Sequence, residues 1–358
     1  MLRVMLVGDG ESIHVRRLAA ALAEIGCEVD LACFEGDPLD GVSLHRIGDL
    51  PARSDRRYGI GVLPLARMMA RRRPDLVHAC FLSSYGLMTN LAVTVLRMRR
   101  VDAPSVVQSP LGSDLLVAAR RSKIRKRLAA LTLRSADLAT FNSTTLDGEI
   151  RALAPRVARH RFVWGPERSL FGRRLGEEPI AVCTRRLEPI MRVDLVVTAW
   201  RRARAIAPER LRRWRLVVTH DGSRREQVAA AAGNDPSIEL PGKLAYGELQ
   251  RLLLRSRLYL SLPESDAASA ALLDGLAAGL LPVLNALPGN LEWADESIGE
   301  IVERDPSVDE VADAIVRAVS RPFVPTHNRD RVRAVVWEDE VRRLLDAYRS
   351  LVQSRNHG

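Results

Sequence analysis

Short apolar runs alternate with segments of helical period along nearly the whole chain, and this alternation limits the possible folds more than any other feature. The first apolar run, at 3–7, is followed by Gly8 and Gly10, then by a helical segment at 12–26 and a second apolar run at 27–34. A strand, a glycine turn, a helix and another strand in that order are typical of a parallel sheet with crossover helices. We therefore predict an α/β protein.

The same alternation appears in two blocks separated by a turn-rich loop at 164–179. In the first block we expect further helices and strands at 63–72, 75–81, 85–97, 105–109, 118–137 and 137–143. In the second block we expect them at 180–184, 193–207, 214–222, 224–232, 237–242, 246–256, 258–263, 269–279, 281–286 and 308–319. Since roughly 100 to 200 residues per domain is usual, the 358 residues suit two Rossmann-like domains that face a central cleft.

Charge and composition narrow the choice of partners. The net charge is +10, but only 4% of the residues are aromatic, and none lies between the arginine clusters to stack on bases. Nucleic acid is therefore not expected as a partner. No apolar run approaches the roughly 18 residues that span a bilayer. The N-terminus reaches Gly8 and Asp9 too early for a secretory signal, so we expect a cytoplasmic protein.

The densest basic segment, at 118–137, has apolar residues on one helical face and basic residues around it. Such a helix can rest on anionic lipid headgroups, which would place the protein at the periphery of the inner membrane face. The alternative is an ordinary solvated helix face in an arginine-rich chain. An anionic membrane surface is thus one candidate partner.

Ligands of open parallel sheets bind beyond the carboxyl ends of the strands, so candidate site residues are sought there. Gly8 and Gly10 follow the first strand, where the backbone either approaches a ligand closely or makes a tight turn. Asp114 follows the strand at 105–109 and opens the basic helix. Its carboxylate could act as a general base or cap the helix.

The segment 264–293 is the most informative part of the chain. Asp266 lies in a loop of small residues, and Asp274 lies within the helix that follows. Ala267, Ala268 and Ser269 leave room for phosphate oxygens to meet backbone N–H groups at the helix N-terminus. An acidic side chain further along the helix suits a ribose diol, so the segment indicates a nucleotide diphosphate site.

These residues give the chain a specific resemblance to glycosyltransferase family 4, whose members have the glycosyltransferase B (GT-B) fold. That family has a Glu, seven residues and a second Glu inside LEAMAAG, and then PVV and GGNPE. Similar motifs stand here in the same order, namely SDAASAALLDGLAAG, LPVL and LPGNLEW. Further motifs agree along residues 4–300: SIHVRRLAAALAEIGCEVDL, RPDLVHA, SADLATFNSTTLDGEI, VWGPERSLF and CTRRLEPIMRVDLVVTAW.

The resemblance implies an N-terminal acceptor domain at 1–165 and a nucleotide-sugar donor domain at 172–335. It also implies that the C-terminal helix at 338–352 returns to the N-terminal domain. Arg186 would hold the donor diphosphate. Asp266 would contact the transferred sugar.

Asp274 would bind the ribose. The family's lysine falls at Met191 or at Arg192, and only the arginine could bind phosphate. Arg185 stands in place of the family's glycine, and aspartate replaces glutamate at both acidic positions. The residues that we assign to catalysis are Asp114 and Asp266, and those that we assign to donor binding are Arg186, Arg192, Ala267, Ala268, Ser269, Asp274 and Gly10.

The expected reaction is transfer of a sugar from a UDP- or GDP-sugar to a hydroxyl of a glycan or lipid-linked acceptor, with retention as the resemblance implies. Neither a cofactor nor a metal ion is expected, because arginines and the helix dipole can take the charge of the leaving diphosphate. His14 and His78 are candidates for acceptor-side roles or for structural ones. The altered positions leave an inactive scaffold or partner subunit as an alternative, and a nucleotide-dependent epimerase as a third reading.

Overall fold

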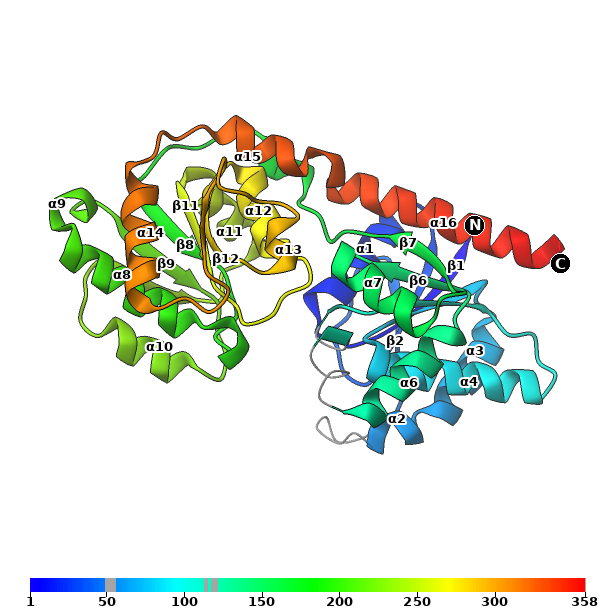
Figure 1. The fold of residues 1–358 in the computed structure, drawn as a ribbon. Helices are drawn as coiled ribbons and strands as arrows, with labels where there is room; N and C mark the ends of the chain where they lie inside the picture. The colour runs from blue at the N-terminus through cyan, green and yellow to red at the C-terminus, as the bar shows by residue number, and fades with distance from the viewer. Residues whose placement is uncertain (49–55, 113–114, 117–121, 358) are drawn as a thin grey trace. The chain divides into compact units, whose positions relative to one another are not determined.

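The computed structural model describes residues 1–48, 56–112, 115–116 and 122–357, and the chain divides into two compact units. The N-terminal unit comprises residues 1–164 together with residues 338–358, and the C-terminal unit comprises residues 165–337. Each unit is built around one sheet in which all strands are parallel. The prediction of two Rossmann-like α/β domains is confirmed (Figure 1).

The sheet of the N-terminal unit has the strand order β3-β2-β1-β4-β5-β6-β7. Its elements are β1 (Arg3–Val7), α1 (Ile13–Glu24), β2 (Glu28–Cys33), β3 (Val42–Arg46), α2 (Arg56–Ile60), α3 (Val62–Arg72), β4 (Leu76–Cys80), a π-turn (Leu82–Gly86), α4 (Leu87–Met98), β5 (Ser105–Ser109), α6 (Lys123–Arg134), β6 (Leu138–Phe141), α7 (Thr144–Leu153) and β7 (Ala158–Arg161). The inner strands β1, β4 and β5 are almost entirely buried, because helices cover both faces of a parallel sheet.

The sheet of the C-terminal unit has the order β10-β9-β8-β11-β12-β13. Its elements are a 3-10 turn (Arg168–Phe171), β8 (Ile180–Cys183), a 3-10 turn (Pro189–Met191), α8 (Val193–Ile206), α9 (Pro208–Leu211), β9 (Arg215–Thr219), α10 (Arg225–Ala232), β10 (Ile238–Gly242), α11 (Tyr246–Arg255), β11 (Leu258–Ser261), α12 (Ala270–Ala278), β12 (Leu281–Asn285), α13 (Pro288–Leu291), β13 (Glu300–Val302), α14 (Val308–Ser320), α15 (Pro325–Val332) and a 3-10 turn (Arg333–Val335).

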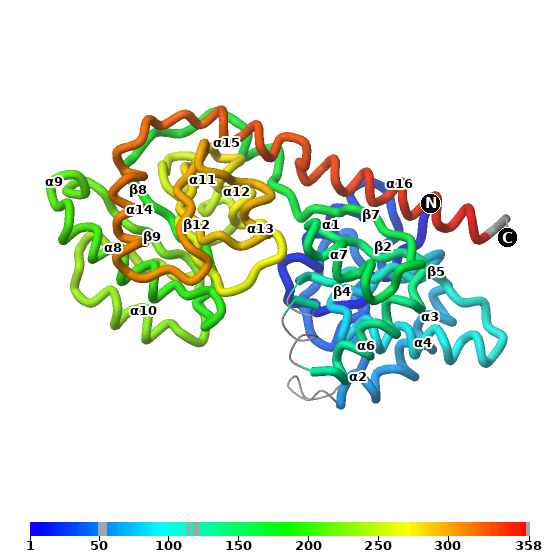
Figure 2. Tube along the Cα trace, viewed as in Figure 1, coloured from blue at the N-terminus to red at the C-terminus, as the bar shows by residue number. Residues whose placement is uncertain are grey.

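The last helix, α16 (Trp337–His357), packs on the N-terminal unit, as the resemblance implied. Its Tyr348 is fully buried, and the phenol oxygen forms a hydrogen bond with Nδ1 of His78 on β4. The Glu340 carboxylate accepts a hydrogen bond from the backbone N–H of Val163 at 2.7 Å. Figure 2 traces this helix in red at the C-terminal end of the chain. The helix is therefore an integral part of the N-terminal unit.

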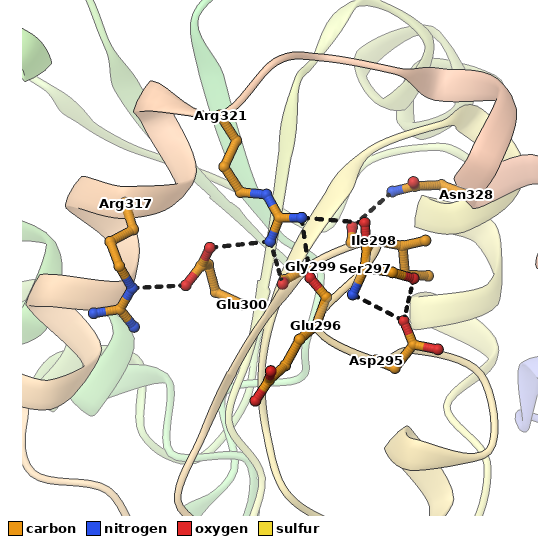
Figure 3. A network of polar contacts seen from close by, with 9 residues as sticks. All are labelled: Asp295, Glu296, Ser297, Ile298, Gly299, Glu300, Arg317, Arg321 and Asn328. Atoms are coloured by element: carbon orange, nitrogen blue, oxygen red, sulfur yellow. Dashed lines mark hydrogen bonds and ion pairs between the residues drawn. The ribbon is translucent and has the colours of Figure 1, made fainter.

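Charged residues hold together the periphery of the C-terminal unit (Figure 3). The Glu300 carboxylate on β13 accepts hydrogen bonds from Arg317 of α14 at 2.8 Å and from Arg321 at 3.1 Å. Asn328 of α15 donates to the backbone oxygen of Ile298 at 3.3 Å. These contacts fix α14 and α15 against the edge strand.

Candidate active site

The candidate site of the C-terminal unit is built by two loops that leave neighbouring strands. Strands β8 and β11 pair in parallel, so the loops after them start at the same edge of the sheet. The backbone N–H of Glu264 in the second loop donates to the oxygen of Ile190 in the first at 2.9 Å. This bond fixes the two loops to each other at the edge where ligands of such sheets bind.

The second loop is fixed from the other side by α13. A Cβ atom added to Gly289 would lie only 2.1 Å from the backbone oxygen of Ala267, so only glycine allows this close approach. The loop ends at Ser269, whose side chain caps α12 by accepting a hydrogen bond from the N–H of Leu272 at 3.1 Å. The short residues at 267–269 thus form a tightly held turn at the helix N-terminus.

Arg185 lies at the centre of these loops. Its side chain is only 8% exposed, and Nη2 lies 2.6 Å from Oδ2 of Asp266. Nη1 donates to the Ser269 hydroxyl, and Nη2 lies 2.9 Å from the Met191 sulfur. Burial by itself lowers the pKa of Arg185, but the Asp266 carboxylate, together with Tyr259 and Cys183, raises the pKa above its usual value. The buried guanidinium is therefore charged.

Arg186, to which the diphosphate was assigned, has a different environment. Its side chain is 67% exposed, and its nearest ion-pair partner is Glu188 at 3.9 Å. Hydrogen bonds from Ser223 hold the pKa of Glu188 below its usual value, so this carboxylate is charged at neutral pH. An exposed guanidinium is free to reorient, and the assignment of Arg186 to the diphosphate stays a prediction.

Arg192 is engaged in contacts within its own unit. Its Nε donates to the backbone oxygen of Leu262 at 2.8 Å, Nη2 to that of Arg304 at 3.2 Å, and Nη1 pairs with Asp305. The side chain is 13% exposed. These bonds anchor the start of α8, so a role in donor binding would require the guanidinium to leave several partners.

The other assigned residues lie in different places. Ala267 is buried, Ala268 is half-buried, and Asp274 is half-buried within α12, about one turn beyond its N-terminus. Asp114 lies outside the described residues. In the N-terminal unit, a Cβ atom at Gly10 would lie 2.3 Å from the Glu35 oxygen, so internal packing alone accounts for this glycine.

The two candidate histidines have structural surroundings. Nε2 of His78 lies 2.5 Å from the Ser109 hydroxyl, while Nδ1 pairs with Tyr348, and burial lowers the pKa of His78 to about 3. The ring of His14 lies 5.0 Å from that of Trp164 in a tilted arrangement. His78 is therefore a neutral residue of the core. Of the two roles considered from the sequence, this is the structural one.

Arg185 was not predicted as a site residue, because its position was expected to hold the family's glycine. The available signal was its place two residues after a buried strand, next to a residue already assigned to the diphosphate. That signal could not tell which of two consecutive arginines turns inward.

The chain has two Rossmann-like domains, and its candidate site lies at the carboxyl edge of the second sheet. This is the arrangement of the GT-B class of proteins. The family model described as "Glycosyl transferase 4-like" matches residues 3–143, and "Glycosyl transferases group 1" matches residues 171–334. Together they include most of the chain, and the protein belongs to the group 1 glycosyltransferases. The resemblance to this family is confirmed. A search among curated proteins returns no match.

Solved structures share this fold at low sequence identity. A sucrose-phosphate synthase from Thermosynechococcus elongatus is 16% identical with a TM-score of 0.80, over 99% of this chain and 100% of that one. The apo form of the lipopolysaccharide outer core galactosyltransferase WaaB is 14% identical with a TM-score of 0.70, over 98% and 99%. Anabaena HepE, in complex with UDP and glucose, is 13% identical with a TM-score of 0.76, also over 98% and 99%.

In the described part of the chain, no group of three or more His, Cys, Asp or Glu side chains is arranged to hold a metal ion. Of the described helices, none has both the length and the apolar composition to cross a bilayer.

Proposed function

We propose that this protein transfers a sugar from a UDP- or GDP-sugar to a hydroxyl group of a glycan or lipid-linked acceptor, with retention of the anomeric configuration. The observation that supports this most directly is the arrangement of Asp266, Ser269 and a buried guanidinium at the edge shared by β8 and β11. A protein of similar fold, Anabaena HepE, was solved in complex with UDP and glucose. The likeness to two UDP-forming trehalose-phosphate synthases from Burkholderia fits the same donor class.

In the proposed reaction, negative charge develops on the departing diphosphate and has to be stabilised. Cationic side chains after β8 and the N–H groups at the start of α12 are suitable for this, because a helix N-terminus favours an anion. Asp266 would orient the transferred sugar, and Asp274 would bind the ribose. Asp114 remains the candidate for a general base on the acceptor side.

The acceptor side of the proposal rests on α6. Of the helix predicted at 118–137, residues 118–121 lie outside the described part of the chain, and α6 runs from Lys123 to Arg134. Its buried side is formed by Ala129, Thr132 and Leu133. Ile124 is consequently 71% exposed. Its neighbours Lys123, Arg125, Lys126 and Arg127 are exposed as well.

An exposed apolar residue surrounded by basic ones is suited to anionic lipid headgroups. We propose on this basis a peripheral membrane contact and a lipid-linked acceptor. Sedimentation with liposomes tests it: binding should require anionic lipid and weaken when Lys126 and Arg127 are replaced by glutamine. Equal sedimentation of the wild type and this variant would leave α6 as an ordinary solvated helix.

Calorimetric titration with UDP and GDP tests the donor. Binding of either one supports the transferase, whereas binding of neither favours the alternative of an inactive scaffold. A mass-spectrometric screen for released nucleotide diphosphate, run with a panel of activated sugars, then identifies the donor and its sugar.

The assigned role of Arg186 has its own test. Arg186→Ala should weaken nucleotide diphosphate binding about tenfold or more, because a hydrogen bond to a charged group is worth about 1.5–3 kcal/mol. The melting temperature should not change, since the side chain is exposed. Unchanged affinity would remove Arg186 from the site.

A further inference from the structure

Of three positions at which this chain departs from the family's pattern, one, Arg185, contacts the other two. Arg185 replaces a glycine, Met191 occupies the position of a lysine, and Asp266 replaces a glutamate. The guanidinium of Arg185 contacts both of the other residues, at 2.6 Å from the Asp266 carboxylate and 2.9 Å from the Met191 sulfur. Independent decay of a site would scatter its changes, whereas these changes fit together as one arrangement.

The arrangement keeps the charge of the site while moving the cation. A lysine is absent at 191, and an arginine has been added at 185, so the loop after β8 still contributes one inward-facing positive charge. Aspartate is one methylene shorter than glutamate, which leaves about 1.5 Å more room for the guanidinium. Met191 supplies a flexible, uncharged surface against the guanidinium, which suits an adaptable thioether.

The stability of the fold does not demand this ion pair. Replacing a buried ion pair by apolar residues of similar volume is often neutral or stabilising, because both charges have to be desolvated. Arg185 is nevertheless buried between two loops at the carboxyl edge of the sheet, and Asp266 beside it is 18% exposed. The pair therefore lies at the edge of the sheet where ligands of such folds bind.

Arginine also has donors to spare for a ligand. A guanidinium has five N–H donors in a planar fork, and the contacts with Asp266, Ser269 and Met191 use only part of them. The fork suits the two oxygens of a phosphate or a carboxylate.

We propose that Arg185 binds an acidic group of the donor, taking the place of the lysine missing at Met191, and that Asp266, besides the contact with the transferred sugar proposed above, holds this guanidinium in position through Oδ2. This rests on the proposed function, because it requires a nucleotide-sugar donor. The acidic group is either the donor diphosphate or a carboxylate on the transferred sugar, and both present paired oxygens to the fork.

The first experiment measures affinity by calorimetry for UDP, UDP-glucose, UDP-glucuronate, GDP and GDP-mannose. Arg185→Ala should weaken the binding of the wild type's preferred ligand about 10- to 100-fold, and Arg185→Lys should recover part of the loss. The double variant Arg185→Ala/Asp266→Asn removes both charges, so no unpaired carboxylate remains in the site. Its affinity for the ligand should fall by the same factor as that of Arg185→Ala. Arg202→Ala removes an exposed arginine that pairs with Asp309 on the same unit, and it should bind like the wild type.

The pattern of losses identifies the acidic group. If it is the diphosphate, every nucleotide diphosphate loses affinity by a similar factor. If it is a sugar carboxylate, the loss is confined to UDP-glucuronate. Asp266→Asn should weaken the same ligands as Arg185→Ala, because Asp266 acts through the guanidinium. A loss with Asp266→Asn that occurs only for uncharged sugars would overturn the positioning role.

The second experiment restores the family's pattern. Met191→Lys alone should weaken binding, since it places an ammonium group beside the Arg185 guanidinium. Arg185→Gly alone should also weaken it, but Arg185→Gly/Met191→Lys should bind the preferred ligand within about threefold of the wild type, roughly 0.7 kcal/mol. If Arg185 had only a structural role, the affinity of this double variant for the ligand would stay as low as that of Arg185→Gly.

Two outcomes separate this inference from the proposed function. Wild-type binding of a nucleotide diphosphate together with unchanged binding by Arg185→Ala overturns the inference and leaves the proposed function intact. Absence of binding by the wild type to any of the ligands overturns both.

Discussion

Acidification should destabilise the N-terminal unit through a single buried histidine, His78. Burial lowers its pKa to about 3 in the folded protein, whereas an exposed histidine has a pKa of about 6.5. Between these values the unfolded chain binds a proton that the folded one does not, so stability falls as the pH decreases below about 6.5. From pH 7 to pH 5 the lost stability is about 2 kcal/mol for this one residue.

The comparison of the wild type with His78→Gln isolates that effect. Glutamine does not titrate, so the variant should lack this loss, although missing hydrogen bonds to Tyr348 and Ser109 should make it less stable than the wild type at pH 7. Other histidines are present in both proteins and cancel in the difference.

Hydrogen–deuterium exchange in urea, followed by mass spectrometry of peptides from β4, reports on this unit separately. The stability difference between wild type and variant should shrink by about 2 kcal/mol between pH 7 and pH 5. Tyr348→Phe is the matched control: it removes one partner of the ring but should retain the wild-type pH dependence. A difference independent of pH would refute the reasoning, because it would mean that His78 binds its proton equally well in both states.

Two further predictions concern the C-terminal unit and the chemistry. Gly289→Ala should force the turn at Ala267 to move, because the added Cβ atom would lie 2.1 Å from the Ala267 backbone oxygen. Nucleotide affinity, measured by calorimetry, should fall at least tenfold. An unchanged affinity would show that the turn is not part of the site. Sugar transfer should persist in excess EDTA, since arginines and a helix N-terminus are proposed to take the diphosphate charge; a loss that Mg²⁺ or Mn²⁺ restores would contradict this.

The inner strands of both sheets could be predicted from the sequence, whereas several edge strands could not. Strands that are covered on both faces have continuous apolar sequences, so β1, β4 and β8 could be predicted from the sequence. By contrast β3 (VSLHR) and β7 (ARHR) are edge strands with half-exposed or exposed residues, and no apolar run reveals them. Their formation depends on pairing with an already formed neighbour, which is a tertiary effect.

The same limit explains what the sequence could and could not say about the candidate site. Asp266 and Ser269 lie between a strand and a helix that both have strong patterns, so their place at one corner followed from the order of elements. Arg185 and Arg186 are adjacent and chemically identical, and the first turns inward while the second stays exposed. That choice depends on the Asp266 carboxylate from another strand's loop, which no local pattern contains.

The contacts of Arg185 also weigh against reading the altered motif as simple decay. An unneeded cation in a decayed site would be expected to turn outward, because burying a guanidinium costs several kcal/mol unless a partner compensates it. Here the Asp266 carboxylate lies 2.6 Å from the guanidinium and is the main cause that raises the pKa of Arg185 against the effect of burial, and the resemblance had assigned this carboxylate to the transferred sugar. A site that has lost its ligand has no reason to retain a matched charge at the ligand's edge. The retained pair therefore favours a donor site with a relocated cation over a scaffold.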